Sequence, residues 1–246
     1  MQPIQKAKDI KRTDNWRVLL YGKPGVGKTS SIKNLKGKTL VLDLDDSFKV
    51  LGGNHSDIDR QPFDRTKPSE EWKEFLTDLN SRIEGYDNLV IDNVSAFEKD
   101  WFVERGRQSK SGIGNEIQDY GQWTNYFARI ITTVFMDAKM NVLVTAWENQ
   151  REITTETGQM FNQYAPAIRD SVRDGLLGLT DVVGRVVINP KTGGRGVILE
   201  GNDGIFAKNR LDSRTSSSIE DLFKFGSDEN VPTAPVSAKD GKSSAK

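Results

Sequence analysis

The 246-residue sequence has no cysteine and only one histidine, His55. The absence of cysteine excludes disulfide bonds and thiolate metal sites, and it is compatible with the reducing cytoplasm in which we expect the protein to work. A single histidine leaves few routes to a zinc site or to a histidine-based catalytic triad. We interpret His55, which lies between Gly53 and Asp57, as a solvated loop residue.

The sequence also lacks net charge and long hydrophobic runs. Its 35 Lys and Arg residues balance its 35 Asp and Glu residues, whereas a protein that coats nucleic acid by bulk electrostatics is usually basic. Any contact with DNA must therefore be local. No apolar run approaches the roughly 20 residues of a transmembrane helix, and the N-terminus lacks a signal-peptide core. We therefore expect no membrane contact.

Composition divides the chain into three parts. Residues 1–15 are polar and are expected to form a flexible arm. Residues 226–246 are rich in Ser, Ala, Pro and Lys and are expected to form a disordered tail. Between them, residues 16–225 have the length and the hydrophobic content of one domain with a buried core.

In the central part, short apolar runs alternate with helical patterns. The expected strands cover residues 16–21, 39–44, 88–92 and 141–146. The expected helices cover residues 29–35, 68–83 and 123–134. This order predicts an α/β fold with a mostly parallel sheet flanked by helices. Further short strands, joined by Gly- and Asn-containing turns, predict an antiparallel hairpin extension; they cover residues 181–189, 196–200 and 204–207.

A glycine-rich loop follows the first expected strand and has the Walker A pattern G-x-x-x-x-G-K-T. It comprises Gly22, Lys23, Pro24, Gly25, Val26, Gly27, Lys28 and Thr29, with Ser30 next in the chain. The glycines let successive backbone N–H groups surround phosphates, and the following helix adds its N-terminal dipole. Lys28 is expected to contact the β- and γ-phosphates, and the Thr29 hydroxyl to bind Mg²⁺.

A glycine-rich turn can also be purely structural, but the position of this loop between a strand and a helix favours nucleotide binding. Nothing in the sequence resembles a guanine-specificity motif, which favours ATP over GTP. The pattern therefore predicts a P-loop NTPase that binds ATP with Mg²⁺.

Asp92 ends the expected strand over residues 88–92 and is the candidate Walker B residue. Its carboxylate is expected to emerge beside the glycine-rich loop and to hold Mg²⁺ through water. The alternative is a structural role as the N-cap of the following helix, where Asp is favoured.

Three segments carry a resemblance to a known class of ATPases. Residues 90–97 (Val-Ile-Asp-Asn-Val-Ser-Ala-Phe) resemble the Walker B strand of RecA-type recombinases. Residues 208–212 (Lys-Asn-Arg-Leu-Asp) resemble the Lys-Asn-Arg-Phe-Gly motif of bacterial RadA/Sms. From Trp16 to about Phe223 the chain is similar to small RecA-like phage ATPases, which are encoded beside single-strand-binding and annealing proteins. The resemblance implies a RecA-like core that acts on or near single-stranded DNA in phage recombination or replication, in the host cytoplasm.

The resemblance also suggests catalytic residues. Asp45, or Asp46 beside it, is expected to polarise the attacking water, although RecA has Glu at this point; the alternative is a turn-forming acidic pair. RecA ends its fourth strand with a Gln that senses the γ-phosphate. This sequence has no Gln there, so Thr145, Trp147 and Glu148 are the candidates.

Lys208 and Arg210 are expected to project from one side of a short strand, because they alternate with Asn209. In the RecA-like class this pair reaches the γ-phosphate of a neighbouring subunit and acts as an arginine finger does. The resemblance therefore implies a homo-oligomer with ATP at the interface. The alternative is two solvated basic residues.

Two segments are candidates for contact with single-stranded DNA. They cover residues 105–114 and 150–163, which follow the third and fourth expected strands where RecA-like proteins have DNA-binding loops. Stacking of a base on Phe161 or Tyr164 would complement phosphate contacts. The candidate phosphate contacts are Arg105, Arg107, Lys110 and Arg151. The alternatives are ordinary mobile loops or loops that bind a partner protein.

Two other functions are compatible with the loop. The first is a nucleotide-dependent adaptor or loader that binds a replication or recombination protein without touching DNA, an interpretation that suits the neutral net charge. The second is a small-molecule kinase. The sequence has no arginine-rich lid and no evident acceptor site, which counts against a kinase.

Overall fold

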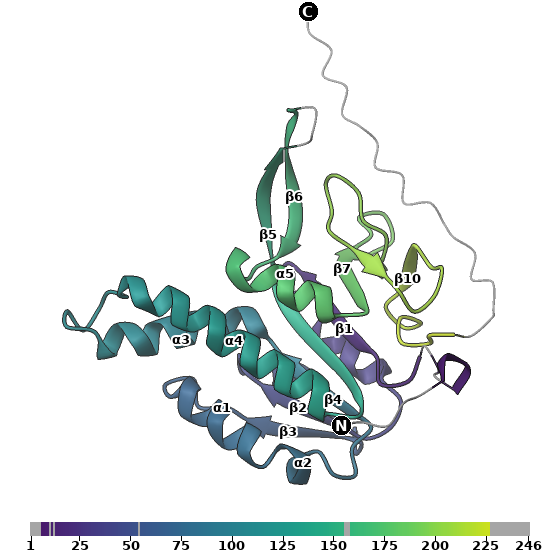
Figure 1. The fold of residues 1–246 in the computed structure, drawn as a ribbon. Coiled ribbons are helices and arrows are strands. Elements are labelled where there is room, and N and C mark those ends of the chain that lie inside the picture. Colours follow the sequence, from purple (N-terminus) through teal and green to yellow (C-terminus); the bar gives the residue numbers. More distant parts are fainter. Residues whose placement is uncertain (1–5, 10, 12, 54, 155–157, 227–246) are drawn as a thin grey trace, which may run out of the picture.

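The computed structural model describes residues 6–9, 11, 13–53, 55–154 and 158–226. Its centre is a mixed sheet whose main path has the strand order β10-β8-β7-β1-β5-β4-β2-β3 (Figure 1). The six strands from β7 to β3 are parallel, whereas β8 and β10 pair antiparallel at one edge. The predicted α/β class with a mostly parallel sheet and an antiparallel extension is therefore confirmed.

The parallel strands are short and apolar. They are β1 (Arg17–Gly22), β2 (Thr39–Asp43), β3 (Ile58–Pro62), β4 (Asn88–Asp92), β5 (Asn141–Thr154) and β7 (Val182–Ile188). Alternate residues on each strand face opposite sides of the sheet. On β1, Leu19 and Tyr21 belong to one hydrophobic core, and Val18 and Leu20 belong to another on the opposite face. The sheet thus separates two buried layers.

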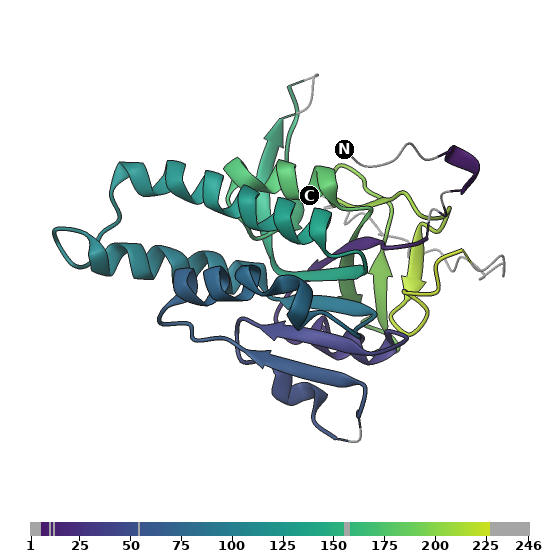
Figure 2. The same cartoon turned by 60° about the horizontal axis from the view of Figure 1, so that its bottom comes forward.

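The α-helices cover one of these faces (Figures 1 and 2). The helices are α1 (Pro68–Thr77), α2 (Leu79–Arg82), α3 (Val94–Gln108), α4 (Ile117–Asp137) and α5 (Asp170–Leu179). Aromatic side chains fill the layer beneath them, with Trp123 of α4 packed against Phe97, Trp101 and Phe127. The opposite face is covered by two 3₁₀ helices, η2 (Thr29–Asn34) and η3 (Phe48–Leu51), and by the C-terminal segment.

The C-terminal strands only partly follow the sequence prediction. β7 and β8 (Arg195–Ile198) form the expected antiparallel hairpin. The prediction of a strand over residues 204–207 is wrong, since Ile205 makes only isolated bridges. Instead, β9 (Lys208–Asn209) pairs with β7 and β10 (Ser216–Ser218) pairs with β8. In the expected arm, Ala7–Asp9 form a 3₁₀ helix, and all of the expected tail except Gly226 lies outside the described residues.

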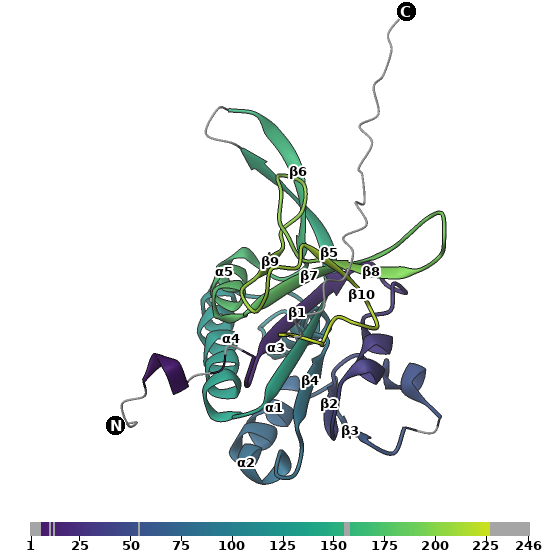
Figure 3. The ribbon, with the colours of Figure 1, turned by 90° about the vertical axis from the view of Figure 1, so that its right-hand side faces the viewer.

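β5 continues eight residues beyond its expected end and forms a two-stranded ribbon with β6 (Met160–Pro166). The ribbon projects from the sheet, as Figure 3 shows. The segment 150–163 is therefore mostly paired strand and not a mobile loop, although residues 155–157 lie outside the described part. The helix expected after the glycine-rich loop is also short: it is the six-residue 3₁₀ helix η2, because Lys36 and Gly37 end it within two turns.

We predict that the aromatic layer under α4 is a main source of stability. Phe127 is 1% exposed, whereas Ile117 on the same helix is 92% exposed. Phe127→Ala should lower the free energy of unfolding by about 3–5 kcal/mol because it leaves a cavity, and Ile117→Ala should change it by less than about 0.5 kcal/mol. Denaturant unfolding followed by circular dichroism measures both. Equal losses in the two variants would contradict this packing.

Candidate functional site

The glycine-rich loop lies at the carboxyl edge of the parallel strands. Gly22 ends β1 and pairs with Trp147 of β5, and the loop then leads into η2. Gly25 and Gly27 have φ angles of +82° and +103°, a conformation that favours glycine. Lys23, Pro24 and Gly25 are exposed, whereas Val26 is buried in the core and anchors the loop. The predicted Walker A residues thus form a loop that is exposed at residues 23–25 and buried at Gly22, Val26 and Lys28, and Ser30 is half-buried in η2.

Lys28 is buried in the centre of this loop. Its Nζ donates hydrogen bonds to the carbonyl oxygens of Gly22, at 2.9 Å, and of Lys23, at 3.0 Å. Burial lowers the pKa of the Lys28 ammonium, and the charges of Asp92, Asp45 and Glu148 partly oppose that shift. The ammonium group is therefore held by carbonyls of the loop, which a phosphate would replace as its partner.

Asp92 connects β4 to the segments that follow β1 and β2 and to the middle of β5. Its Oδ2 accepts hydrogen bonds from the Thr29 hydroxyl at 2.7 Å and from the Ser47 hydroxyl at 3.0 Å. Its Oδ1 accepts a hydrogen bond from the Thr145 hydroxyl. The Asp92 side chain is almost fully buried, so these donors compensate a carboxylate that water cannot reach. The structure thus brings the two predicted magnesium ligands, Thr29 and Asp92, into direct contact.

The N-cap alternative for this position applies to the next residue instead. The side chain of Asn93, not that of Asp92, accepts the backbone N–H of Ala96 at the start of α3. The Asp92 carboxylate instead accepts the hydrogen bonds from Thr29, Ser47 and Thr145.

The side chains of Asp45 and Asp46, which follow β2, point in different directions. Asp45 turns toward the site and accepts a hydrogen bond from the Asn93 amide at 2.5 Å. Burial, and secondarily the charges of Asp92 and Asp43, raise the pKa of the Asp45 carboxyl. Asp46 has a φ of +61°, is exposed and forms an ion pair with Arg60 at 2.5 Å. Of the two predicted candidates for the catalytic base, only Asp45 lies beside Asp92 and Asn93.

The residues considered as γ-phosphate sensors lie in the middle of β5, not at its end as expected. Thr145 is bound to Asp92, and Glu148 forms an ion pair with Arg185 of β7 at 2.7 Å. The Arg185 guanidinium also lies 3.6 Å from the ring centre of Tyr164. Trp147 lies under the Lys99 ammonium, 4.4 Å from its ring centre. All three candidates therefore have partners in the chain, and Thr145 alone touches the Asp92 carboxylate.

A family model provides an independent comparison for this geometry. The model described as an AAA domain matches residues 14–211, which is most of the chain. The chain belongs to this AAA family. It contains an AAA-type P-loop ATPase domain, and such domains bind nucleotide at the loop that residues 22–29 form here. No curated protein sequence matches the chain.

Lys208 and Arg210 of this AAA domain both reach α5, although β9 ends at Asn209 and Arg210 lies beyond the strand. Both donate to backbone carbonyls at the C-terminal end of α5, Lys208 to Leu177 and Arg210 to Gly178. Positive charge at this end of a helix is favoured by the helix dipole. β9 pairs with Val182 and Val183 of β7, and these two residues pair with Val18 and Leu19 of β1. Lys208 and Arg210 therefore lie near the middle of β1, several residues before the glycine-rich loop of the same chain begins.

The candidate DNA contacts have different surroundings. Arg105 belongs to α3, and its side chain bonds Asp119 and Gln122 of α4. Arg151 bonds Gln163 across the ribbon. Arg107 and Lys110 are exposed near the turn between α3 and α4. The expectation that a flexible loop begins at Arg105 is therefore wrong, because α3 continues to Gln108, but Arg107 and Lys110 stay accessible.

Sequence reasoning missed Ser47. Its hydroxyl lies 3.2 Å from the hydroxyl of Thr29 and donates a hydrogen bond to the Asp92 carboxylate. Its backbone N–H donates to Asp43 and Asp45, which fixes the turn. The only available signal was its position: it follows a buried strand at the same edge as the glycine-rich loop.

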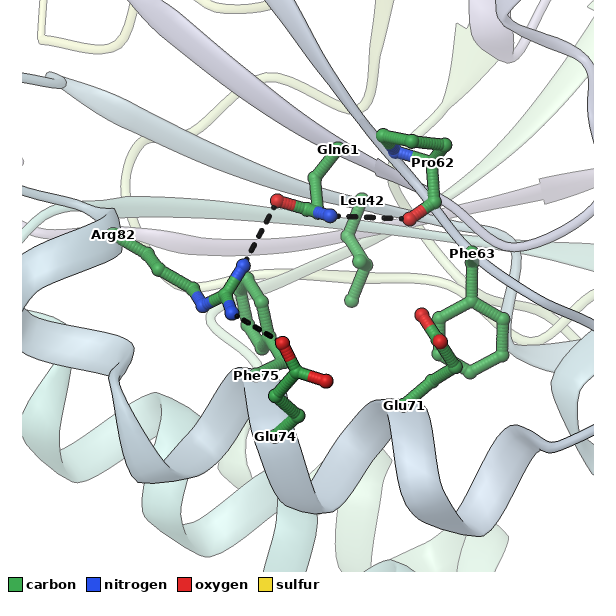
Figure 4. Close-up of a pocket in the computed structure, with 8 residues that line it drawn as sticks. All are labelled: Leu42, Gln61, Pro62, Phe63, Glu71, Glu74, Phe75 and Arg82. Carbon is green, nitrogen blue, oxygen red and sulfur yellow. Dashed lines mark hydrogen bonds and ion pairs between the residues drawn. The ribbon is translucent and has the colours of Figure 1, made fainter.

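A cavity between β3 and α1 has no place in the site (Figure 4). It measures about 20 Å³ and is crossed by Arg82, which bonds Gln61 and Glu74. This volume holds about one water molecule, whereas small-molecule sites have roughly 300–1,000 Å³.

In the described part of the chain, no helix is long and apolar enough to cross a membrane.

We predict that the Asp92 carboxylate is required for ATP hydrolysis. Asp92→Asn keeps the shape of the side chain but removes its charge, and it should lower phosphate release about 10- to 100-fold. Asp46→Asn is the matched control, because Asp46 points to Arg60 and Asn tolerates its positive φ. An equal loss of phosphate release in the control would contradict the assignment of Asp92.

Lys208 should make stability depend on pH. Burial, and then the nearby charge of Arg210, lower the pKa of its ammonium from 10.5 to about 8. Between these two values the unfolded chain keeps a proton that the folded chain has lost, so the free energy of unfolding rises with pH. The difference between wild type and Lys208→Met should therefore rise from pH 8 to 10.5 and be flat well below pH 8. Denaturant unfolding at several pH values measures it, and a difference that falls in this window would contradict the shift.

Proposed function

We propose that the protein is a magnesium-dependent ATPase that acts on or near single-stranded DNA in recombination or replication. The observation that carries the ATPase part is the contact between Thr29 of the glycine-rich loop and Asp92 of β4, at 2.7 Å. Hydroxyl and carboxylate oxygens are ligands that Mg²⁺ accepts, usually together with substrate phosphates. Thr29 and Asp92 would hold the ion, which would neutralise charge on the phosphates.

The rest of the site supports hydrolysis by this chain's own groups. Lys28 would bind the β- and γ-phosphates. Asp45 would orient and deprotonate the attacking water, and burial favours this because it raises the pKa of the carboxyl. The hydrogen bond from Asn93 keeps Asp45 in place beside Asp92. Thr145 is the candidate for sensing the γ-phosphate, because its hydroxyl is bound to the same carboxylate as Thr29.

The proposed DNA contact is best supported at the projecting end of α3 and α4. Arg107 and Lys110 are exposed there and have no bonded partner among the described residues, so both are available to phosphates. Arg105 and Arg151, in contrast, would first have to leave Asp119 and Gln163. A homo-oligomer with ATP at the interface also belongs to the proposal. In it Lys208 and Arg210 would leave the α5 carbonyls for the phosphates of a neighbour.

The adaptor function has one specific observation in its favour. Ile113 and Ile117 are 88% and 92% exposed, close to Arg107 and Lys110 at the same projecting end. Two neighbouring exposed isoleucines offer apolar area to a partner protein. In this alternative the ATPase cycle would control binding of a single-strand-binding or annealing protein, and the chain itself would not touch DNA.

Phosphate release from ATP with Mg²⁺, measured with and without single-stranded DNA, tests the proposal. Wild type should hydrolyse ATP, Lys28→Ala should lose at least about 100-fold because the phosphates lose a charged ligand, and single-stranded DNA should raise the wild-type rate. Arg107→Ala with Lys110→Ala should keep the basal rate and lose the stimulation. A Lys28-dependent rate that ignores DNA would favour the adaptor, and a rate unchanged by Lys28→Ala would refute the ATPase site.

A further inference from the structure

The β7–β8 hairpin packs directly on the glycine-rich loop. β7 lies beside β1, with Tyr21 paired to Arg185, and it continues three residues further to Ile188, past the edge at which the loop begins. A Cβ atom built on Gly22 would lie 2.8 Å from the backbone oxygen of Val186. The chain therefore turns back toward β8 immediately beside the residues that form the phosphate cradle.

Arg195 is the first residue of β8 and lies against Gly27. A Cβ atom built on Gly27 would lie 2.8 Å from both Cδ and Nε of Arg195, so only a glycine leaves room for this arginine in the observed position. Gly27 directly precedes Lys28, whose ammonium occupies the centre of the loop. The hairpin thus brings a second cation to the phosphate loop of the same chain, next to Lys28.

The backbone of Arg195 is fixed while its charged group is available. Arg195 pairs with Ile188 in the β7–β8 ladder, and its carbonyl accepts the N–H of Ile219 at 3.3 Å. The turn of the hairpin is closed by two hydrogen bonds between Asn189 and the glycines 193 and 194, each at 2.8 Å. Within the described residues the exposed Arg195 guanidinium has no hydrogen-bond or ion-pair partner.

We propose that Arg195 is a nucleotide-binding residue that donates hydrogen bonds, within its own chain, to the phosphate chain of a nucleoside triphosphate held by residues 22–29. The inference rests on the proposed nucleotide binding and extends it. A guanidinium is always charged and presents a planar fork of donors that matches phosphate oxygens. An unpaired guanidinium on a rigid strand, in contact with the phosphate loop, is therefore already positioned for this contact.

Binding of a fluorescent ATP analogue with Mg²⁺ to the full chain tests this inference, with inorganic tripolyphosphate as a competitor. Arg195→Ala should weaken binding of both ligands about 10- to 100-fold, the effect of hydrogen bonds to a charged group. Arg195→Lys should lose less, because it keeps the charge but not the fork. Lys191→Ala is the matched control, since Lys191 is an exposed cation in the turn of the same hairpin, and it should bind as wild type does.

A second variant separates a lost contact from a lost fold. Arg195→Met keeps the aliphatic stem against Gly27 and removes the charge, and its thermal unfolding should match that of wild type. The inference is overturned if Arg195→Met binds as wild type does, if Lys191→Ala loses as much as Arg195→Ala, or if only the analogue and not tripolyphosphate is affected. In those cases Lys28→Ala still abolishes binding and nucleotide binding stands. If wild type and Lys28→Ala bind equally poorly, nucleotide binding itself fails and the inference with it.

Discussion

One buried carboxylate, that of Asp92, connects four neighbouring strands. It accepts hydroxyls from the residues that follow β1 and β2 and from β5, and it ends β4 itself. A carboxylate shielded from water is costly unless donors surround it. The positions of Thr29, Ser47 and Thr145 are therefore coupled, and a change at any of these residues should shift the glycine-rich loop.

The sheet makes this meeting possible. Because β1, β2, β4 and β5 are parallel, their carboxyl ends lie at one edge, where ligands of open α/β sheets bind. The antiparallel hairpin of β7 and β8 packs against that edge, where Val186 contacts Gly22 and Arg195 contacts Gly27. The aromatic layer under α3 and α4 supports β4 from the other side through Phe97. Sheet, hairpin and helices thus all pack around the site.

Much of this arrangement could be predicted from the sequence because its signals are local. Apolar runs predicted β1, β2, β4 and β5, and the G-x-x-x-x-G-K-T spacing predicted the loop. β3 carries polar residues at the sheet edge, so it has no apolar run to detect. The choice between Asp45 and Asp46 depends on the positive φ at Asp46, and the contacts of Ser47 depend on strand order. The spacing of residues along the sequence predicts neither the backbone angle at Asp46 nor the contacts of Ser47. The β5–β6 ribbon was missed because Glu, Gln and Arg dominate β5 beyond Trp147.

A crystal structure of the protein with Mg²⁺ and a non-hydrolysable ATP analogue tests the central claim most directly. The account predicts that the Lys28 ammonium moves from the carbonyls of Gly22 and Lys23 to the phosphates, and that Thr29 and Asp92 lie at the ion. An analogue bound elsewhere, with Lys28 still on the loop carbonyls, would contradict the claim that this edge of the sheet is the ATPase site.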